Sequence, residues 1–266
     1  MLKGHIFGAA AVTALLPISL AVPVLGVNAY NAETAQVRIN PDTPERTSLA
    51  VVVGDAVYGT DNMHEPRTAL SVVKVYLGYW VLKNGEAEDL ALVKPMIQIS
   101  DNNATTRLDQ KYPQAMREAI AELGLKDTRY FGKWGAMVTS AYDMATALAA
   151  IRQDPEAAVL LELMREAPDT TPSGFDQTSG TDSLPGAIGS KHGWMYSTPT
   201  TNSMTYGEGW VAAAMTQGSS ETLTDDVHAN ITVTYPDVCH QPTPYRRLAG
   251  LLTMVNEGPS APLARS

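Results

Sequence analysis

One segment of the chain, Leu70–Asn84, limits the fold more than any other. Its pattern predicts a helix, and apolar side chains occupy nearly every face of that helix: Val72, Val73, Val75, Tyr76, Leu77, Tyr79, Trp80, Val81 and Leu82. A helix that is hydrophobic all round is stable in water only when other elements cover all of its sides. We therefore expect the rest of the chain to bury this helix.

Two polar residues stand at the start of this helix. Ser71 and Lys74 are three positions apart, so they share one helical face and lie within reach of each other. Burial lowers the pKa of a lysine and favours the neutral amine, which can accept a proton. A serine beside such an amine is a candidate activated nucleophile. Taken alone, the pair is more typical of a capping serine and a lysine that extends to the surface.

Two further polar motifs follow along the chain. Ser100-Asp101-Asn102 stands at the end of a helical stretch, where the alternative is an Asx-rich turn that caps the next helix. Lys191-His192-Gly193-Trp194 stands at the end of a predicted strand, after a long polar loop. A Lys-x-Gly motif is common in proteins. The one at Lys191–Gly193 therefore indicates a site only because it follows the other two motifs in order.

The pattern along the chain places strands near both ends and helices between them. The predicted strands are Ser48–Val57, where a glycine break indicates a strand pair or a strand with a turn, and Ala187–Lys191, Gly209–Thr216 and Ala229–Tyr235. The predicted helices are Leu70–Asn84, Ala87–Met96, Pro113–Leu123, Ser140–Arg152, Pro155–Glu166 and Tyr245–Val255. Glu33–Glu45 and Pro168–Pro185 predict irregular segments. This order predicts an α/β or α+β unit of two lobes, with a sheet built from both termini and a helical insertion.

The first 29 residues resemble an export signal. Lys3 precedes an uncharged, mostly apolar stretch, Ile6–Val27, and Val27-Asn28-Ala29 offers small residues at a cleavage site. The alternative is an uncleaved anchor that holds the protein at a membrane, because the apolar stretch approaches spanning length. Either way, we expect residues 30–266 to form a single extracytoplasmic domain.

Charge and cysteine content exclude several classes of function. The chain has 19 Lys and Arg against 28 Asp and Glu, a net charge of −9 without basic runs, which makes a nucleic-acid partner improbable. The single cysteine, Cys239, rules out an internal disulfide and any Cys-x-x-Cys zinc or redox motif. No glycine-rich nucleotide loop or His-Glu-x-x-His string occurs, so we expect no cofactor and no metal.

Together, the three polar motifs resemble those of the serine β-lactamase and penicillin-binding protein superfamily, most closely its class A β-lactamase-like branch. Three longer segments add to the resemblance: Met96–Leu108 around the second motif, Thr139–Ala150 after the family's Ω-loop, and Gly189–Trp194 at the third motif. The resemblance implies the β-lactamase/D,D-peptidase-like fold, with an antiparallel sheet and a helical lobe.

The resemblance also implies roles for individual residues. Ser71 would be the acylated nucleophile, Lys74 its general base, and Ser100 the hydroxyl that relays a proton to the leaving group. The backbone N–H of Ser71 would form part of the oxyanion hole. The substrate-binding residues that the resemblance implies are Asn102, Lys191, His192, Gly193 and Trp194.

The chain departs from the family pattern in two places. His192 stands where the family has a threonine or serine, so the hydroxyl that binds the substrate carboxylate is missing. The segment Leu125–Val138, where class A enzymes carry the Ω-loop glutamate that activates the deacylating water, is short and has Asp127 as its only carboxylate. Its aromatic residues, Tyr130, Phe131 and Trp134, are packing anchors or a hydrophobic wall at the edge of the site.

The resemblance and these departures together predict an extracytoplasmic serine hydrolase that acts on D-alanyl amide or β-lactam bonds and deacylates slowly. The alternative is a non-catalytic or weakly acylating binding protein of the bacterial cell envelope. In either case we expect a monomer whose ligand is a small molecule or a peptidoglycan-like fragment.

Overall fold

A five-stranded antiparallel sheet forms the centre of the computed structural model, which describes residues 35–40 and 42–235. The order of its strands is β3-β2-β8-β7-β6. Their bounds are Thr47–Val53 (β2), Ala56–Gly59 (β3), Ala187–Met195 (β6), Thr200–Gly207 (β7) and Trp210–Thr216 (β8). Strands from the two ends of the chain meet where β2 pairs with β8. The predicted α/β fold, with a sheet built from both termini, is therefore confirmed.

The strand pair predicted over Ser48–Val57 is the β2–β3 hairpin. Val53 pairs with Ala56, so the turn between the strands consists of Gly54 and Asp55. Gly54 has a φ of 57°, a conformation that glycine adopts without the steric cost of a side chain.

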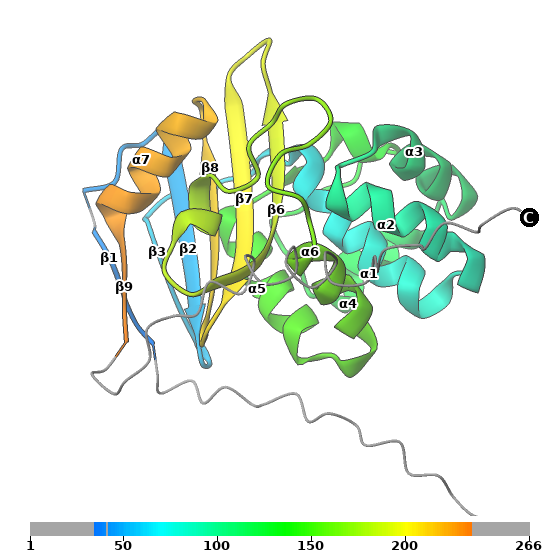
Figure 1. The fold of residues 1–266 in the computed structure, drawn as a ribbon, viewed down its shortest axis with the longest axis horizontal. Coiled ribbons are helices and arrows are strands. Elements are labelled where there is room, and N and C mark those ends of the chain that lie inside the picture. Colours follow the sequence, from blue (N-terminus) through cyan, green and yellow to red (C-terminus); the bar gives the residue numbers. More distant parts are fainter. Residues whose placement is uncertain (1–34, 41, 236–266) are drawn as a thin grey trace, which may run out of the picture.

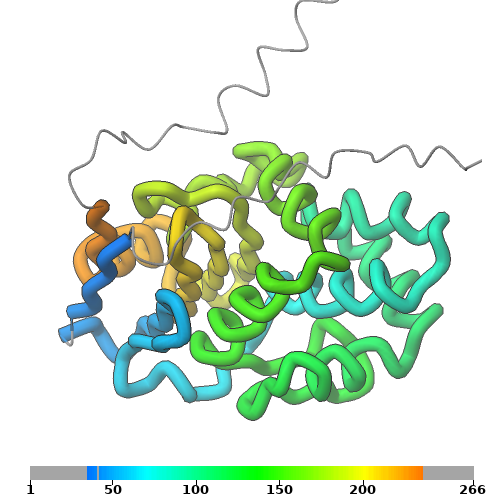
Figure 2. The backbone as a smooth tube through the Cα atoms, turned by 90° about the horizontal axis from the view of Figure 1, so that it is seen from below, coloured from blue at the N-terminus to red at the C-terminus, as the bar shows by residue number. Residues whose placement is uncertain are grey.

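The helices form a lobe on one side of the sheet, as Figures 1 and 2 show. Their bounds are Lys74–Asn84 (α1), Leu90–Gln98 (α2), Asn102–Lys111 (α3), Ala115–Glu122 (α4), Ala141–Gln153 (α5) and Ala158–Arg165 (α6). All the helices predicted between residues 70 and 166 are present, with slightly shifted ends. The predicted helix Tyr245–Val255, Cys239 and the segment 1–29 lie outside the described residues.

Both faces of the sheet are buried. On β2, Ala50 and Val52 pack with the helical lobe, whereas Leu49 and Val51 face a second core. This second core contains Leu223 and Val227 of a further helix, Ser220–Asn230 (α7), which lies on the opposite side of the sheet from α5 (Figure 1). A strand that is covered on both faces is apolar at successive positions, which explains the continuous hydrophobic run of β2.

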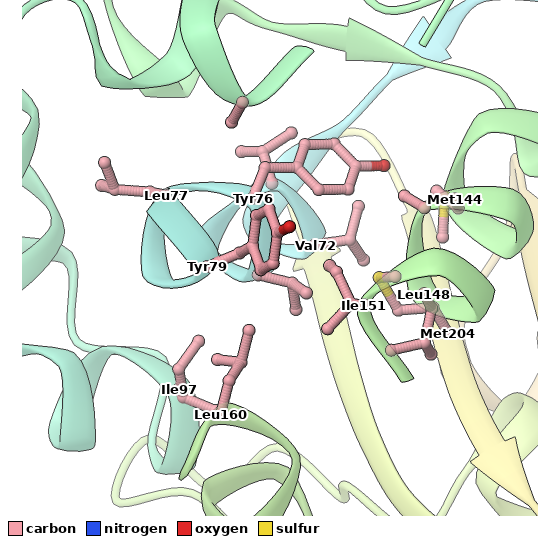
Figure 3. Close-up of a cluster of buried hydrophobic side chains, with 14 of the residues drawn as sticks. Val72, Tyr76, Leu77, Tyr79, Ile97, Met144, Leu148, Ile151, Leu160 and Met204 are labelled. Carbon is pink, nitrogen blue, oxygen red and sulfur yellow. The ribbon is translucent and has the colours of Figure 1, made fainter. Parts of the chain in front are cut away.

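Helix α1 has the central position that its sequence predicts. Every residue from Lys74 to Val81 is buried. Figure 3 shows Tyr76 and Leu77 among side chains from surrounding helices and from β7, including Ile97, Leu148, Leu160 and Met204. The helix begins as a 3₁₀ helix over Leu70–Val73 and continues as α1.

Five elements differ from the sequence prediction. Gln36–Ile39 (β1) is a strand in a segment that was expected to be irregular, and it pairs with Ile231–Thr234 (β9). The predicted strand Ala229–Tyr235 is shorter, because α7 extends to Asn230. The helices α3 and α7 and the strand β7 were not predicted. Their sequences are rich in Thr, Ser, Asn and Asp and carry few apolar residues, so they lack a hydrophobic period.

Candidate active site

The backbone before Ser71 makes a sharp, strained turn. The chain leaves a short strand, Arg67–Thr68 (β4), and Leu70 adopts a φ of 55° before the 3₁₀ helix that contains Ser71. A positive φ is costly for a branched, bulky residue and persists only where surrounding contacts enforce it. Such strain is common where a reactive side chain has to be presented in a fixed direction.

Asn202, a residue of β7 that the sequence analysis missed, supplies two of these contacts. Its side-chain Nδ2 donates hydrogen bonds to the carbonyl oxygens of Thr68, at 2.9 Å, and Ala69, at 3.0 Å. Asn202 is fully buried, so the sheet holds the turn from behind. Nothing in a single sequence distinguishes this asparagine from its polar neighbours on β7.

Gly193 brings the edge strand β6 directly against this turn. A Cβ atom at Gly193 would lie 2.7 Å from both the Cβ of Leu70 and the backbone nitrogen of Ser71. These distances are too short for any side chain, so only glycine permits the approach. The third motif is thus placed beside the first, as the predicted site requires.

Lys74 is buried and connects the first two motifs. Its Nζ lies 2.6 Å from the carbonyl oxygen of Ser100, 3.1 Å from Ser100 Oγ and 2.7 Å from Asn102 Oδ1. The side chain is fully enclosed, which excludes the alternative of a lysine that extends to the surface. The structure therefore brings Lys74, Ser100 and Asn102 into direct contact.

The enclosure of Lys74 changes its chemistry. Burial lowers its pKa from 10.5 to about 7, an effect that the negative charge of Asp101 partly offsets. The ring of Trp134 covers the amine, with its centre 4.8 Å from Nζ. At neutral pH a large fraction of Lys74 is then the neutral amine that can accept a proton.

The second motif, Ser100-Asp101-Asn102, both caps the next helix and contributes side chains to the site. Asp101 caps α3, because its carboxylate accepts hydrogen bonds from the backbone of Asn103, at 2.7 Å, and Ala104, at 3.0 Å. Ser100 and Asn102, on either side of the cap, both contact Lys74. Ser100 has a φ of 59°, so the turn is strained here too.

Lys191 lies in the middle of β6 and not at a strand end as predicted, since the strand continues to Met195. Its side chain is fully buried, and its Nζ lies 3.3 Å from the carbonyl oxygen of His192. Burial, and then the nearby charge of Lys74, hold the pKa of Lys191 well below its usual value. Lys74 is therefore close enough to disfavour a charge on Lys191.

His192 packs under the loop that precedes β6. It is fully buried, its Nε2 is 2.9 Å from the carbonyl oxygen of Ser179, and its ring centre lies 5.8 Å from that of Phe175. Phe175 also stacks on Trp194, with ring centres 3.9 Å apart. The structure thus places His192 behind an aromatic layer, away from the residues that line the neighbouring cavity.

A cavity of about 440 Å³ connects the motifs. Its lining residues are Ser71, Ile99, Ser100, Asp101, Asn102, Pro172, Ser173, Trp194 and Tyr196. Ser71, the hydroxyl-bearing Ser100 of the second motif and the end of β6 therefore share one space. Pro172, Ser173 and Tyr196 are lining residues that the sequence analysis did not identify.

Two carboxylates fasten the first part of the short segment Leu125–Val138. Asp127 bonds to His64 Nδ1 and Ser140 Oγ, each at 2.9 Å. The carboxylate of Asp143 accepts hydrogen bonds from the backbone at the start of the segment, including 2.8 Å from Asp127 N. Both carboxylates therefore stabilise the loop through hydrogen bonds, and neither lines the cavity.

Aspartate 109 holds the aromatic part of the same segment. Asp109 accepts hydrogen bonds from Tyr130 OH, at 2.9 Å, and from the backbone nitrogen of Trp134, at 3.1 Å. Tyr130 and Trp134 are partly buried against the helical core, whereas Phe131 is 64% exposed. Trp134 is thus a packing anchor and, through its contact with Lys74, also a wall of the site.

Within residues 35–40 and 42–235, no helix has the length and hydrophobicity that a membrane span needs. The same part of the chain contains no group of three His, Cys, Asp or Glu side chains that could hold a metal ion.

Comparison with known proteins identifies similar sequences and folds. The model of a family described as the beta-lactamase enzyme family matches residues 90–234, more than half of the chain. No curated protein matches the chain significantly. Two solved structures with similar folds are a class A beta-lactamase from Bacteroides cellulosilyticus (TM-score 0.54, 17% identity, covering 71% of this chain and 90% of that one) and PBP-A (TM-score 0.55, 17% identity, covering 74% and 87%).

A third similar structure is penicillin-binding protein D2 from Listeria monocytogenes in its cefotaxime-bound form (TM-score 0.53, 18% identity). The match covers 71% of this chain and 97% of that one. At these identities the likeness establishes the fold.

Proposed function

Because the chain belongs to the beta-lactamase enzyme family, we propose that it is a serine acyl-enzyme hydrolase with Ser71 as the nucleophile. One observation carries the proposal. A buried lysine with a pKa of about 7 contacts the hydroxyl of Ser100, and this hydroxyl shares a cavity with Ser71. A nucleophile and a relay hydroxyl in one cavity, with a neutral amine in contact with that hydroxyl, are the groups that acyl transfer needs.

Acylation would begin when the neutral amine of Lys74 removes the proton of Ser71. The Ser71 oxygen then attacks the substrate carbonyl, and its backbone N–H stabilises the oxyanion. When the tetrahedral intermediate collapses, the proton passes from Lys74 through Ser100 Oγ to the leaving nitrogen. Lys74 Nζ donates a 3.1 Å hydrogen bond to Ser100 Oγ, which is the geometry that such a relay needs once the amine has taken up the proton.

Deacylation would be the slow step. The only carboxylate of Leu125–Val138, Asp127, is engaged with His64 and Ser140, and Trp134 covers Lys74. Lys74 would then have to serve as the base in both steps. A missing general base that contributes 10²–10⁴-fold raises the barrier by roughly 3–5 kcal/mol.

The proposed reaction class is hydrolysis of a D-alanyl amide or a β-lactam, without metal or cofactor. We further propose that the protein works outside the cytoplasm, exported or anchored through its first 29 residues. A monomer that binds a small molecule or a peptidoglycan-like fragment is consistent with the small size of the cavity.

A second candidate is a binding protein that acylates weakly or not at all. Two observations favour it: Trp134 covers Lys74, and the carboxylate of Leu125–Val138, on Asp127, is engaged elsewhere and does not line the cavity. Such a protein would hold its ligand without turnover.

Intact-mass measurement separates the two candidates. We would incubate the protein with benzylpenicillin and, separately, with p-nitrophenyl phenylacetate, an uncharged activated ester. The hydrolase proposal predicts one acyl group per chain with at least one donor, and none in Ser71→Ala. Absence of an adduct with both donors, or an adduct that survives in Ser71→Ala, would overturn it.

A further inference from the structure

The loop between α6 and β6 forms one wall of the cavity beside Ser71. Its residues Pro172 and Ser173 line the cavity. A backbone hydrogen bond closes this loop on itself, since the N–H of Gln177 donates to the carbonyl oxygen of Asp169 at 2.7 Å. The wall therefore has a defined shape, and its place beside the cavity depends on what anchors the loop to the rest of the molecule.

Two buried side chains of the loop provide these anchors. The ring of Phe175 stacks on Trp194 of β6, with ring centres 3.9 Å apart. Gln177 is 2% exposed, and its side-chain Nε2 donates hydrogen bonds to the carbonyl oxygens of Gln98, at 2.9 Å, and Pro168, at 2.8 Å. The loop thus connects β6, which carries the third motif, to the end of α2, which precedes the second motif.

The hydrogen bond from Gln177 reaches the chain immediately before Ser100. Gln98 is the last residue of α2, and Ser100 follows two positions later with a φ of 59°. The last carbonyl groups of a helix have no partner within the helix, so a side-chain donor can fix where the helix ends. By bonding the carbonyl of Gln98, Gln177 holds the start of the strained turn that orients Ser100.

The orientation of Ser100 matters because its hydroxyl is the proposed proton relay. Lys74 Nζ lies 2.6 Å from the carbonyl oxygen of Ser100 and 3.1 Å from its Oγ. Proton transfer needs heavy atoms about 2.6–3.2 Å apart, so the second contact lies near the long end of the useful range. A misplacement of about 1 Å can cost about 10²-fold in rate. A small movement of this turn would therefore weaken the relay.

We propose that Gln177 is a positioning residue that holds Ser100 where its hydroxyl can protonate the leaving group. The inference rests on the proposed function of Ser71. In the step concerned, the bond between the carbonyl carbon and the leaving atom breaks, and the acyl group stays on Ser71 Oγ. The leaving atom takes a proton from Ser100 Oγ, which takes one from Lys74 Nζ, and Lys74 becomes a neutral amine again. Gln177 therefore matters only for leaving groups that need this proton.

The test uses two esters that place the same phenylacetyl group on Ser71. p-Nitrophenyl phenylacetate releases a stable anion that needs no proton, whereas 2,2,2-trifluoroethyl phenylacetate releases a basic alkoxide that does. Acylation of the full-length protein is followed by intact mass. Gln177→Met fills the space without a donor. We expect it to slow the trifluoroethyl ester about tenfold, part of the 10²–10⁴-fold that a positioned proton donor contributes, and to leave the nitrophenyl ester nearly unchanged.

Three further variants separate positioning from general stability. Gln177→Glu keeps the shape of the side chain but has no donor, so it should reproduce Gln177→Met and replaces it if that variant does not fold. Thr178→Val is the matched control, because Thr178 is exposed and its hydroxyl bonds to Asp176, at 2.7 Å, within the same loop. It should change neither rate. Once Ser100→Ala has removed the relay, Gln177→Met should have no further effect on the ratio of the two rates.

Several results would overturn the inference while leaving Ser71 as the nucleophile. These are an equal slowing of both esters by Gln177→Met, an unchanged rate for the trifluoroethyl ester, or a further change of the ratio in Ser100→Ala. Acylation of the unsubstituted protein by the nitrophenyl ester alone would also overturn it. No acylation of Ser71 by either ester would overturn the proposed function. The two kinds of failure are distinguishable, because the first leaves a phenylacetyl adduct on the protein.

Discussion

The ring of Trp134 lies 4.8 Å from the Nζ of Lys74, so an aromatic face covers the amine that we propose as the general base. This contact joins the short segment Leu125–Val138 to the start of α1. It keeps water from one side of the amine and contributes to the burial that lowers the pKa of Lys74 to about 7.

The first prediction concerns pH. The reactive form of Lys74 is the neutral amine, so acylation should rise with pH through about 7 and level off above it. In Trp134→Ala the amine is more hydrated, its pKa rises, and the profile should move to higher pH, because burial is the largest cause of the shift. Trp134→Phe retains a ring and should move the profile less. Acylation rates measured by intact mass between pH 5.5 and 9 would give the three profiles; an unchanged midpoint in Trp134→Ala would contradict the argument.

The second prediction concerns the nucleophile and its base. Ser71→Ala should abolish acylation, and Lys74→Ala should slow it by roughly 10²–10⁴-fold, the contribution of a general base. Because Lys74 is fully buried, Lys74→Met serves as a companion that fills the space without an amine. A fast Lys74→Met variant would show that Lys74 is not the base. Thermal unfolding of each variant identifies any loss that arises from misfolding.

The third prediction concerns Asn202 as a positioning residue. Asn202→Asp keeps the shape of the side chain but removes the two donors to Thr68 and Ala69. We expect a loss of about 1–3 kcal/mol in the free energy of unfolding, the cost of buried carbonyls left without partners. Because the turn before Ser71 is then free to relax, the acylation rate of the folded protein should also fall. A destabilised Asn202→Asp with an unchanged acylation rate would limit this residue to a structural role.

The fourth prediction concerns Gly193. A methyl group there would lie 2.7 Å from Leu70 Cβ and Ser71 N, so Gly193→Ala should displace β6 from the turn and strongly reduce acylation. Gly135→Ala is the matched control, because a Cβ there would meet no atom within 4 Å. Acylation by p-nitrophenyl phenylacetate and unfolding by heat would be compared for both. Normal acylation by Gly193→Ala would show that the close approach is not required.

The fifth prediction concerns turnover. With p-nitrophenyl phenylacetate we expect a burst of one equivalent of nitrophenol, followed by a steady rate slower than the burst by at least about 100-fold. The physical reason is the engagement of Asp127 with His64 and Ser140, which leaves the segment Leu125–Val138 without a carboxylate that could activate water. Stopped-flow absorbance would record both phases. Sustained turnover at the burst rate would mean that another group acts as the deacylating base.

Much of this architecture could be predicted from the sequence because it depends on short-range patterns. Nine apolar residues on all faces of Leu70–Asn84 require a buried helix, and the structure places α1 at the centre. The glycine in Ser48–Val57 predicts a break, and Gly54 forms the hairpin turn. The spacing of Ser71 and Lys74 predicts that they share one helical face; in the structure Ser71 lines a cavity with Ser100, and Lys74 contacts Ser100 Oγ.

Tertiary structure alone decided the features that depend on contacts between distant segments. Asn202 lies more than a hundred positions after the carbonyls that it binds, and its neighbours on β7 are polar, so no local pattern identifies it. The burial of His192 behind Phe175, and of Lys191 within β6, depends on a loop that packs over an edge strand. The residue types of a motif follow from the sequence, but the water, charge and neighbours around each side chain follow from how the chain packs. These surroundings set the pKa of Lys74.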